Sequence, residues 1–166
     1  MKDNIKTRHL VELAVLSSFV VVLGMVVKIQ TPVGIFTPMC DAGIFVIALL
    51  FGASSSLTVG ALSGFLIDFL SGAYEWMFFS LVIHGLQGLI VGLSLKKKQT
   101  PKTIYRFFAL VLGGMVMVTG YALSGSFLYG WTLSIVKVPG NIIQTGLGIV
   151  IAMIVESIVK KVIRKL

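Results

Sequence analysis

The chain has 166 residues and a formal net charge of +8, from 14 basic and 6 acidic residues. Apolar residues make up 57% of it, charged residues only 12%, and the mean hydropathy is +1.02. Soluble domains carry about twice that share of charge, roughly 25%, so a soluble enzyme, a disordered chain and a collagen-like rod are excluded. We expect a single all-α integral membrane domain over residues 1–166.

Apolar stretches predict the membrane-spanning helices in chain order. The first covers about 9–29; it is too long for the apolar part of a signal peptide, so we expect it to be retained. The next, 41–71, is too long for one span of about 20 residues, and Gly52–Ser56 interrupts it. Later stretches predict helices over about 76–95, 104–125 and 138–160.

Charge indicates how the 41–71 stretch is divided. Twelve of the 14 basic residues lie in three clusters, and the positive-inside rule places all three in the cytoplasm. The clusters are Lys2, Lys6 and Arg8, then Lys96, Lys97, Lys98, Lys102 and Arg106, and finally Lys160, Lys161, Arg164 and Lys165. Two short helices, 41–55 and 56–71, satisfy the rule and give a six-transmembrane-helix bundle with cytoplasmic termini. A re-entrant hairpin at 41–71 would place the basic clusters on the same side of the membrane, so it remains an alternative.

Three loops then face outward, at 28–41, 71–76 and 126–139. They hold both tryptophans, Trp76 and Trp131, together with Tyr129 and Asp41. Tryptophans at a membrane edge are also typical interface anchors, so this alternative stands beside a binding role.

Polar side chains inside the spans are costly in hydrocarbon, which makes them candidates for function. Ser80, His84 and Gln87 follow the spacing i, i+4, i+7, and Asn141 and Gln144 are at i, i+3, so each set shares a helix face. Together with the loop residues they predict a polar, aromatic-walled pocket open to the outside. The candidate binding residues are Asp41, Trp76, Ser80, His84, Gln87, Tyr129, Trp131, Asn141 and Gln144. The alternatives are bonds within one helix and polar contacts between helices.

Small residues recur at helical spacing and predict close helix contacts. Gly60 and Gly64 form one such pair, and Ala14 and Ser18 form another on the first helix. Packing within the molecule is the simpler explanation for any single pair.

Several motifs of other chemistries are absent from the sequence. It has no Walker A loop, HExxH or GxSxG motif, so the chain itself is predicted neither to hydrolyse ATP nor to act as an enzyme. Cys40 is the single cysteine, and His9 and His84 are the only histidines. These residues cannot build a metal site, and we expect no cofactor. The basic residues flank apolar spans, so no nucleic-acid partner is expected.

Four segments of the chain resemble the substrate-binding (S) components of energy-coupling factor (ECF) transporters. They are Cys40–Gly52, Gly64–Gly72, Trp76–Phe79 and Gly85–Gly92. The likeness is clearest over 41–95, and the length and number of spans extend it along the chain.

The resemblance implies a six-helix protein of the prokaryotic plasma membrane that binds a vitamin from outside. It implies docking onto a transmembrane coupling protein and two ATPase subunits, with the S component toppling to carry the ligand inward. Members present an Ala-xxx-Ala motif to the coupling protein, and Ala14 and Ser18 stand at that place. The ligand of such proteins lies between the three outer loops and the ends of the last three helices, and the loop at 28–41 acts as a lid.

The substrate is predicted from the pocket residues and from the branch of the family that the chain resembles, whose members are assigned to pyridoxine, hydroxymethylpyrimidine, riboflavin and pantothenate. Flat aromatic rings suit tryptophan and tyrosine, and ring nitrogens suit the amide and histidine side chains. We favour a vitamin B6 form or hydroxymethylpyrimidine. An independent carrier or channel and a non-transport scaffold remain alternatives, and the roles of Asp68 and Glu75 and the motion of the lid stay open.

Overall fold

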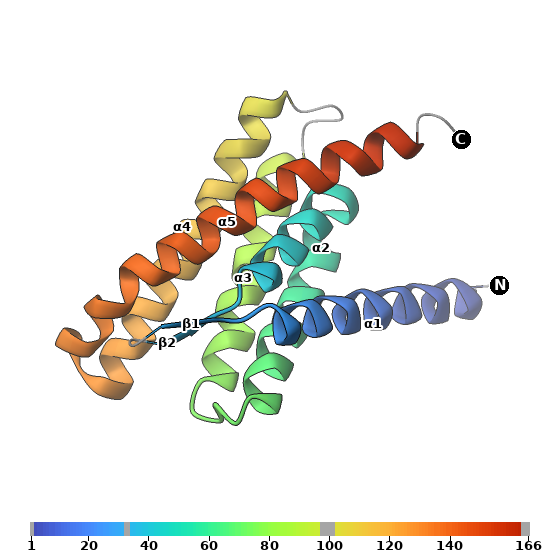
Figure 1. The fold of residues 1–166 in the computed structure, drawn as a ribbon. Helices are drawn as coiled ribbons and strands as arrows, with labels where there is room; N and C mark the ends of the chain where they lie inside the picture. The colour runs from blue at the N-terminus through green and yellow to red at the C-terminus, as the bar shows by residue number, and fades with distance from the viewer. Residues whose placement is uncertain (1, 32–33, 97–101, 164–166) are drawn as a thin grey trace.

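The computed structural model describes residues 2–31, 34–96 and 102–163 (Figure 1). For residues 2–6 and 163 only the helix that contains them is described. Some residues used in the charge argument and in the loop predictions therefore lie outside the described residues. They are residues 32 and 33 of the 28–41 segment, Lys97, Lys98, Arg164 and Lys165, and the side chains of Lys2 and Lys6.

Five helices and one two-stranded antiparallel sheet make up the described part of the chain. They are α1 (Lys2–Val26), β1 (Ile29–Thr31), β2 (Gly34–Phe36), α2 (Pro38–Leu70), α3 (Met77–Leu95), α4 (Thr103–Tyr129) and α5 (Trp131–Ile163). Each of these five helices is long and apolar enough to cross a membrane. The expected helical fold with helices of membrane-spanning length is thereby confirmed, and the short sheet is an addition that the sequence did not predict.

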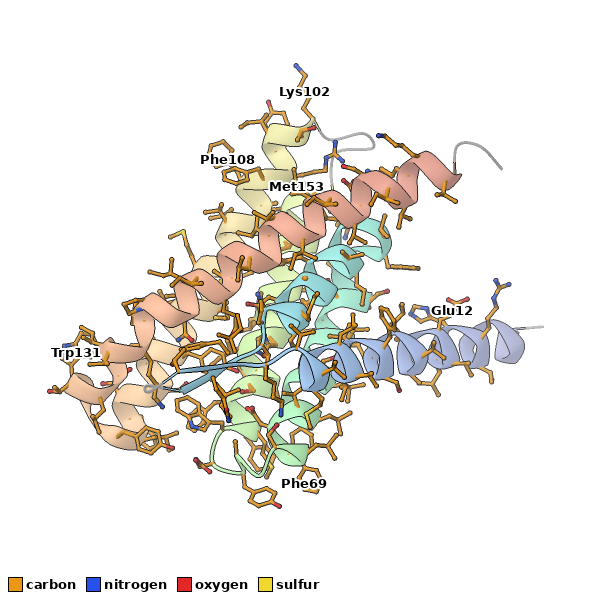
Figure 2. All side chains as sticks on the ribbon, in the orientation of Figure 1. Glu12, Phe69, Lys102, Phe108, Trp131 and Met153 are labelled. Carbon is orange, nitrogen blue, oxygen red and sulfur yellow. The ribbon has the colours of Figure 1, made fainter. Side chains whose placement is uncertain are left out.

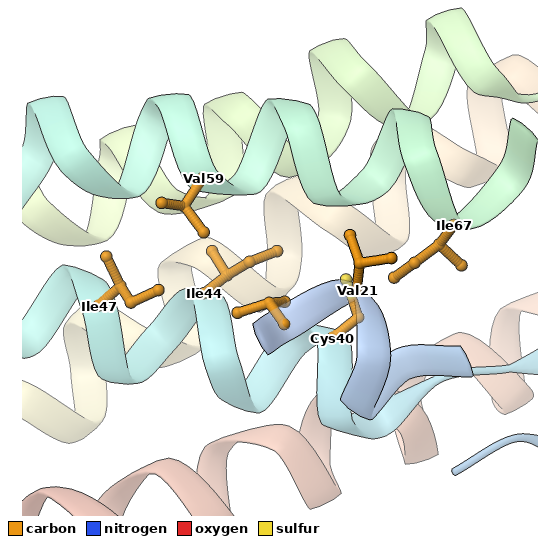
Figure 3. Packing of buried hydrophobic residues seen from close by; sticks show 7 residues of the cluster. Val21, Cys40, Ile44, Ile47, Val59 and Ile67 are labelled. Carbon is orange, nitrogen blue, oxygen red and sulfur yellow. The ribbon is translucent and has the colours of Figure 1, made fainter. Parts of the chain in front are cut away.

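The helix α2 is broken at Gly52, where φ is 82° and ψ is −169°. A positive φ of this kind is readily adopted only by glycine. Beyond it the helix resumes at Ala53, and the two parts lie side by side (Figure 3). Their facing side chains form one apolar cluster with Val20 and Val21 of α1, comprising Cys40, Ile44, Ile47, Val59 and Ile67. The interruption that the sequence predicts at Gly52–Ser56 is thus a turn at Gly52.

Glycines bring the second part of α2 against α3. A Cβ on Gly60 would lie 2.3 Å from the carbonyl oxygen of His84, and one on Gly88 would lie 2.5 Å from that of Ser56. Backbones this close leave no room for a side chain. The small pair predicted at Gly60 and Gly64 therefore serves packing inside the molecule.

Two predicted loops are structured in the protein. The prediction of a loop at 126–139 is wrong, because α4 continues to Tyr129 and α5 begins at Trp131, with only Gly130 between them. Gly130 has φ of 84°, so one residue makes the turn. The segment expected as a loop at 28–41 contains the β1–β2 hairpin, in which Ile29 pairs with Phe36.

The two ends of the bundle differ in chemistry. The N- and C-termini lie toward one side of the molecule, and the hairpin lies toward the other (Figure 1). Lys102 lies next to the first residue of α4. Trp131, the first residue of α5, lies at the opposite end of α4 (Figure 2). Near Lys102, Arg106 donates to both carboxylate oxygens of the buried Glu156 at 2.6 Å. Lys160 also contacts this carboxylate, so ion pairs join α4 to α5 there.

Replacing Gly60 with alanine is expected to lower the free energy of unfolding by about 1–3 kcal/mol, because the new methyl group overpacks the α2–α3 contact. The measurement is the thermal unfolding midpoint of the purified protein in detergent. Gly146→Ala is the matched control, since a Cβ there meets no atom within 4 Å. Equal midpoints for the two variants would contradict the packing role of Gly60.

Candidate functional site

A pocket of about 320 Å³ lies at the end of the bundle that carries the hairpin. Its walls come from β2, the end of α2, the 71–76 loop, and the adjoining ends of α4 and α5. The lining residues are Lys28, Gly34, Ile35, Phe36, Thr37, Ile67, Asp68, Ser71, Ala73, Glu75, Trp76, Tyr121, Tyr129, Lys137, Asn141 and Gln144. Segments far apart in the sequence thus meet in one concave site.

Aromatic rings form one wall of the pocket. The Trp76 ring centroid lies 5.6 Å from that of Tyr121 and 5.7 Å from that of Tyr129. The Lys137 ammonium lies 5.2 Å from the Trp76 centroid and 5.0 Å from that of Tyr129, within range of a cation–π contact. This wall can stack on a flat ring or hold a cation.

At the rim of this wall the Tyr129 hydroxyl donates to Glu75 at 2.9 Å. The pKa of Glu75 is lowered by a hydrogen bond from its own backbone N–H and by the one from Tyr129. An ionised Glu75 therefore faces Lys137 at the mouth.

The hairpin is fastened over the pocket to α5. Phe36 is buried against Gly140, where a Cβ would lie only 2.1 Å from the tip of the ring. The Thr37 backbone N–H donates to Oε1 of Gln144 at 2.8 Å. The segment expected as a lid therefore lines the site and is held to α5 by one apolar and one polar contact.

Beneath the pocket, a buried carboxylate accepts hydrogen bonds from the side-chain amides of two helices. Asp41 has no exposed surface. Nε2 of Gln87 donates to its Oδ1, and Nε2 of Gln144 donates to its Oδ2, each at 3.1 Å. Oε1 of Gln87 lies 2.7 Å from Nδ1 of His84.

The same series of contacts continues to the opposite wall. Nε2 of His84 lies 3.1 Å from the Tyr121 hydroxyl, which lies 2.6 Å from the Ser80 hydroxyl. Ser80 in turn donates to Asp68, a pocket-lining residue. We call this series the polar chain; it consists of Gln144, Asp41, Gln87, His84, Tyr121, Ser80 and Asp68.

The predicted binding residues fall into three groups. Trp76, Tyr129, Asn141 and Gln144 line the pocket. Asp41, Ser80, His84 and Gln87 belong to the polar chain. Trp131 is 60% exposed and lies outside the lining.

Some residues that complete the site were not among the predicted set. Tyr121 links Ser80 to His84, and its place as a polar residue inside a span was an available signal. Phe36 and Asp68 line the pocket. Thr37 acts through its backbone, which no side-chain pattern reveals.

The predicted partner-binding pair lies elsewhere. Ala14 and Ser18 are exposed on α1, and the Ser18 hydroxyl donates to the Ala14 carbonyl at 2.9 Å. The pair therefore presents a small, internally satisfied surface. Among the residues that the structure describes, no three His, Cys, Asp or Glu side chains gather as metal ligands would.

Comparison with known proteins identifies the family. A family model described as "ECF-type riboflavin transporter, S component" matches residues 4–161. The thiamine precursor transporter HmpT of Lactococcus lactis subsp. cremoris is 32% identical over 163 residues, covering 97% of this chain and 93% of the relative. An uncharacterized protein of Pyrococcus woesei is 34% identical over 143 residues, covering 86% and 95%. The resemblance to S components is thus confirmed: the chain belongs to the ECF-type riboflavin transporter S component family of membrane-embedded transport proteins.

Proposed function

We propose that this S component binds a small heteroaromatic vitamin precursor, hydroxymethylpyrimidine, in the pocket under the hairpin. The observation that carries the proposal is that the aromatic wall of Trp76 and Tyr129 lines one cavity together with Asp68, Asn141 and Gln144. Stacking would hold the ring, and the carboxylate and amides would hold its nitrogens and hydroxymethyl group.

Pocket size supports a one-ring ligand. The volume of about 320 Å³ lies at the small end of the roughly 300–1,000 Å³ typical of ligand sites. Riboflavin, the ligand in the family description, has three fused rings and a ribityl chain. The name of the Lactococcus relative instead points to a thiamine precursor. A vitamin B6 form, also one ring with hydroxymethyl groups, is the second candidate.

The charges at the site support a neutral ligand. Lys28 and Lys137 line the pocket together with Asp68 and Glu75, so the two signs balance. Lys28 donates to Ser71 at 2.9 Å, and Lys137 lies over the aromatic wall. Each cation therefore already has a partner, whereas recognition of a strongly anionic ligand would require a cation that is available to pair with it.

We propose six membrane spans, counting the two parts of α2 separately, with the pocket facing outward. The side-by-side parts of α2 support this count. The described basic residues Lys102, Arg106, Lys160 and Lys161 lie at the end of α4 and α5 away from the pocket, as cytoplasmic charges would.

We propose that the exposed Ala14 and Ser18 face of α1 docks on the transmembrane coupling protein, which works with two ATPase subunits. The first helix packs on α2 and leaves its other side uncovered. Two small residues one turn apart let a partner helix approach closely.

Ligand binding is expected to quench the fluorescence of Trp76. In a Trp131→Phe variant, Trp76 is the single tryptophan, and titration of the purified, ligand-free protein with hydroxymethylpyrimidine should give saturable quenching. Pyridoxine and riboflavin serve as competitors in the same assay, and mass spectrometry checks that the starting site is empty.

Trp76→Leu should weaken binding about two- to tenfold, because a stacked aromatic pair contributes ~0.5–1.5 kcal/mol. Calorimetry provides the affinity of this variant, whose quenching signal is lost. An empty wild-type site that ignores every compound, or binds only riboflavin, would refute the proposed ligand.

Ala14→Leu is expected to abolish uptake while leaving ligand affinity unchanged, because the larger side chain blocks a close helix contact. Uptake is measured in proteoliposomes that contain the coupling protein, both ATPases and ATP. Val15→Leu, at a neighbouring exposed position of α1, is the matched control and should transport normally.

These proteoliposomes also test the alternative of an independent carrier. Uptake by this chain alone, without partners or ATP, would favour that alternative. A loss of ligand affinity in Ala14→Leu would instead assign α1 to the ligand-binding fold.

A further inference from the structure

The directions of the hydrogen bonds around Asp41 follow from the donors available. The Thr37 backbone N–H can only donate, so Oε1 of Gln144 must face it and Nε2 of Gln144 must donate to Asp41. With Asp41 ionised, Nε2 of Gln87 also donates to it, which leaves Oε1 of Gln87 as an acceptor. Nδ1 of His84, 2.7 Å away, therefore carries a proton.

The rest of the polar chain has one hydrogen-bonding proton fewer than it has links. Three links join His84 to Tyr121, Tyr121 to Ser80, and Ser80 to Asp68. The two hydroxyl groups supply one proton each. A neutral His84 with an ionised Asp68 would therefore leave one link with lone pairs facing each other. Such an unsatisfied contact is costly in a buried site.

We propose that the polar chain holds one additional proton, shared between His84 and Asp68. In one state His84 is an imidazolium: its Nε2 donates to Tyr121, Tyr121 donates to Ser80, and Ser80 donates to an ionised Asp68. In the other state all three donations reverse, with Asp68 protonated and His84 neutral. Each link keeps its proton in both states, so the proton passes from the core to the pocket wall without movement of heavy atoms.

Charged and titratable groups of both signs act on the chain, and the carboxylates among them favour retention of this proton. Within the chain, Oδ1 of Asp41 lies 3.6 Å from Nδ1 of His84. From outside the chain, the Cys40 thiol of the first part of α2 acts on Tyr121 of α4. Glu75 of the 71–76 loop and Lys28 act on Asp68. The member of the chain from α5 is the neutral amide of Gln144, and Lys137 of the same helix lies over Trp76 and Tyr129.

The additional proton reduces the negative charge buried among these groups. Without it, the ionised Asp41 and Asp68 would stand against Lys28, which is hydrogen-bonded to Ser71. Uncompensated charge in a membrane interior is unfavourable.

The relay gives the pocket wall an adaptable hydrogen-bonding group. Asp68 can present an O–H donor or a carboxylate acceptor to a bound ring without exchanging protons with water. This consequence rests on the proposed function. The relay itself does not, and its test uses no ligand.

The test observes both ends of the relay in the full chain reconstituted in lipid nanodiscs. His9→Gln leaves His84 as the single histidine, so ring ¹⁵N signals report which of its nitrogens are protonated. Infrared difference spectra report a protonated carboxyl group. Near neutral pH we expect an imidazolium signal, a carboxylic acid band, or both, each lost in Asp68→Asn. The new amide can donate to Ser80, which completes the chain with a neutral His84.

Two further variants separate the relay from nearby charge. Glu75→Gln removes a carboxylate of the pocket that lies outside the chain, and it should keep the signals. Tyr121→Phe cuts the chain and should abolish them. Ser80→Ala cuts the chain at another hydroxyl and serves if the phenylalanine variant does not remain monodisperse. Neutral His84 without an Asp68 acid band would overturn the proposal, as would an imidazolium that persists in Asp68→Asn.

Discussion

The buried carboxylate of Asp41 holds the site together. It receives one amide from α3 and one from α5, and the same Gln144 that donates to it also accepts the Thr37 N–H that fastens the hairpin. Removing either amide would leave one oxygen of this buried carboxyl group without its donor, at a cost on the order of 1–3 kcal/mol. A close backbone approach supports this arrangement, because a Cβ on Gly148 would lie 2.7 Å from Cβ of Asp41.

The glycines of α2 and α3 set the rest of the geometry. In a bilayer, helix association depends on close packing and polar contacts, because lipid tails are as apolar as the side chains. The contact of Gly60 and Gly64 with α3 brings His84 and Ser80 next to α2. Asp68 and Asp41, from opposite parts of α2, thereby reach the same helix of the bundle. The glycine contacts and the hydrogen bonds of the polar chain consequently stabilise the same interface, between α2 and α3.

The pocket combines a rigid floor with an aromatic, charged mouth. The floor is fixed by the hydrogen bonds of the polar chain, whereas Lys137, Glu75 and Tyr129 interact at the exposed rim. A floor fixed in this way is organised before any small molecule enters the pocket. Phe36 of the hairpin and Thr37, the residue after it, line the same cavity and also hold this segment to α5.

The sequence by itself determined the membrane class and the helical fold, and it named four residues that line the pocket, Trp76, Tyr129, Asn141 and Gln144. Hydropathy and the basic clusters are sums over many residues, so local detail does not disturb them, and the cost of polar groups in hydrocarbon singles out His84 and Gln144. Only the tertiary structure decided that Tyr121 connects two candidate residues, that Gly130 alone makes a turn, and that Trp131 stands apart from the pocket. These features depend on distances between helices and on backbone torsion, and the Thr37 contact depends on a backbone N–H that every residue except proline carries.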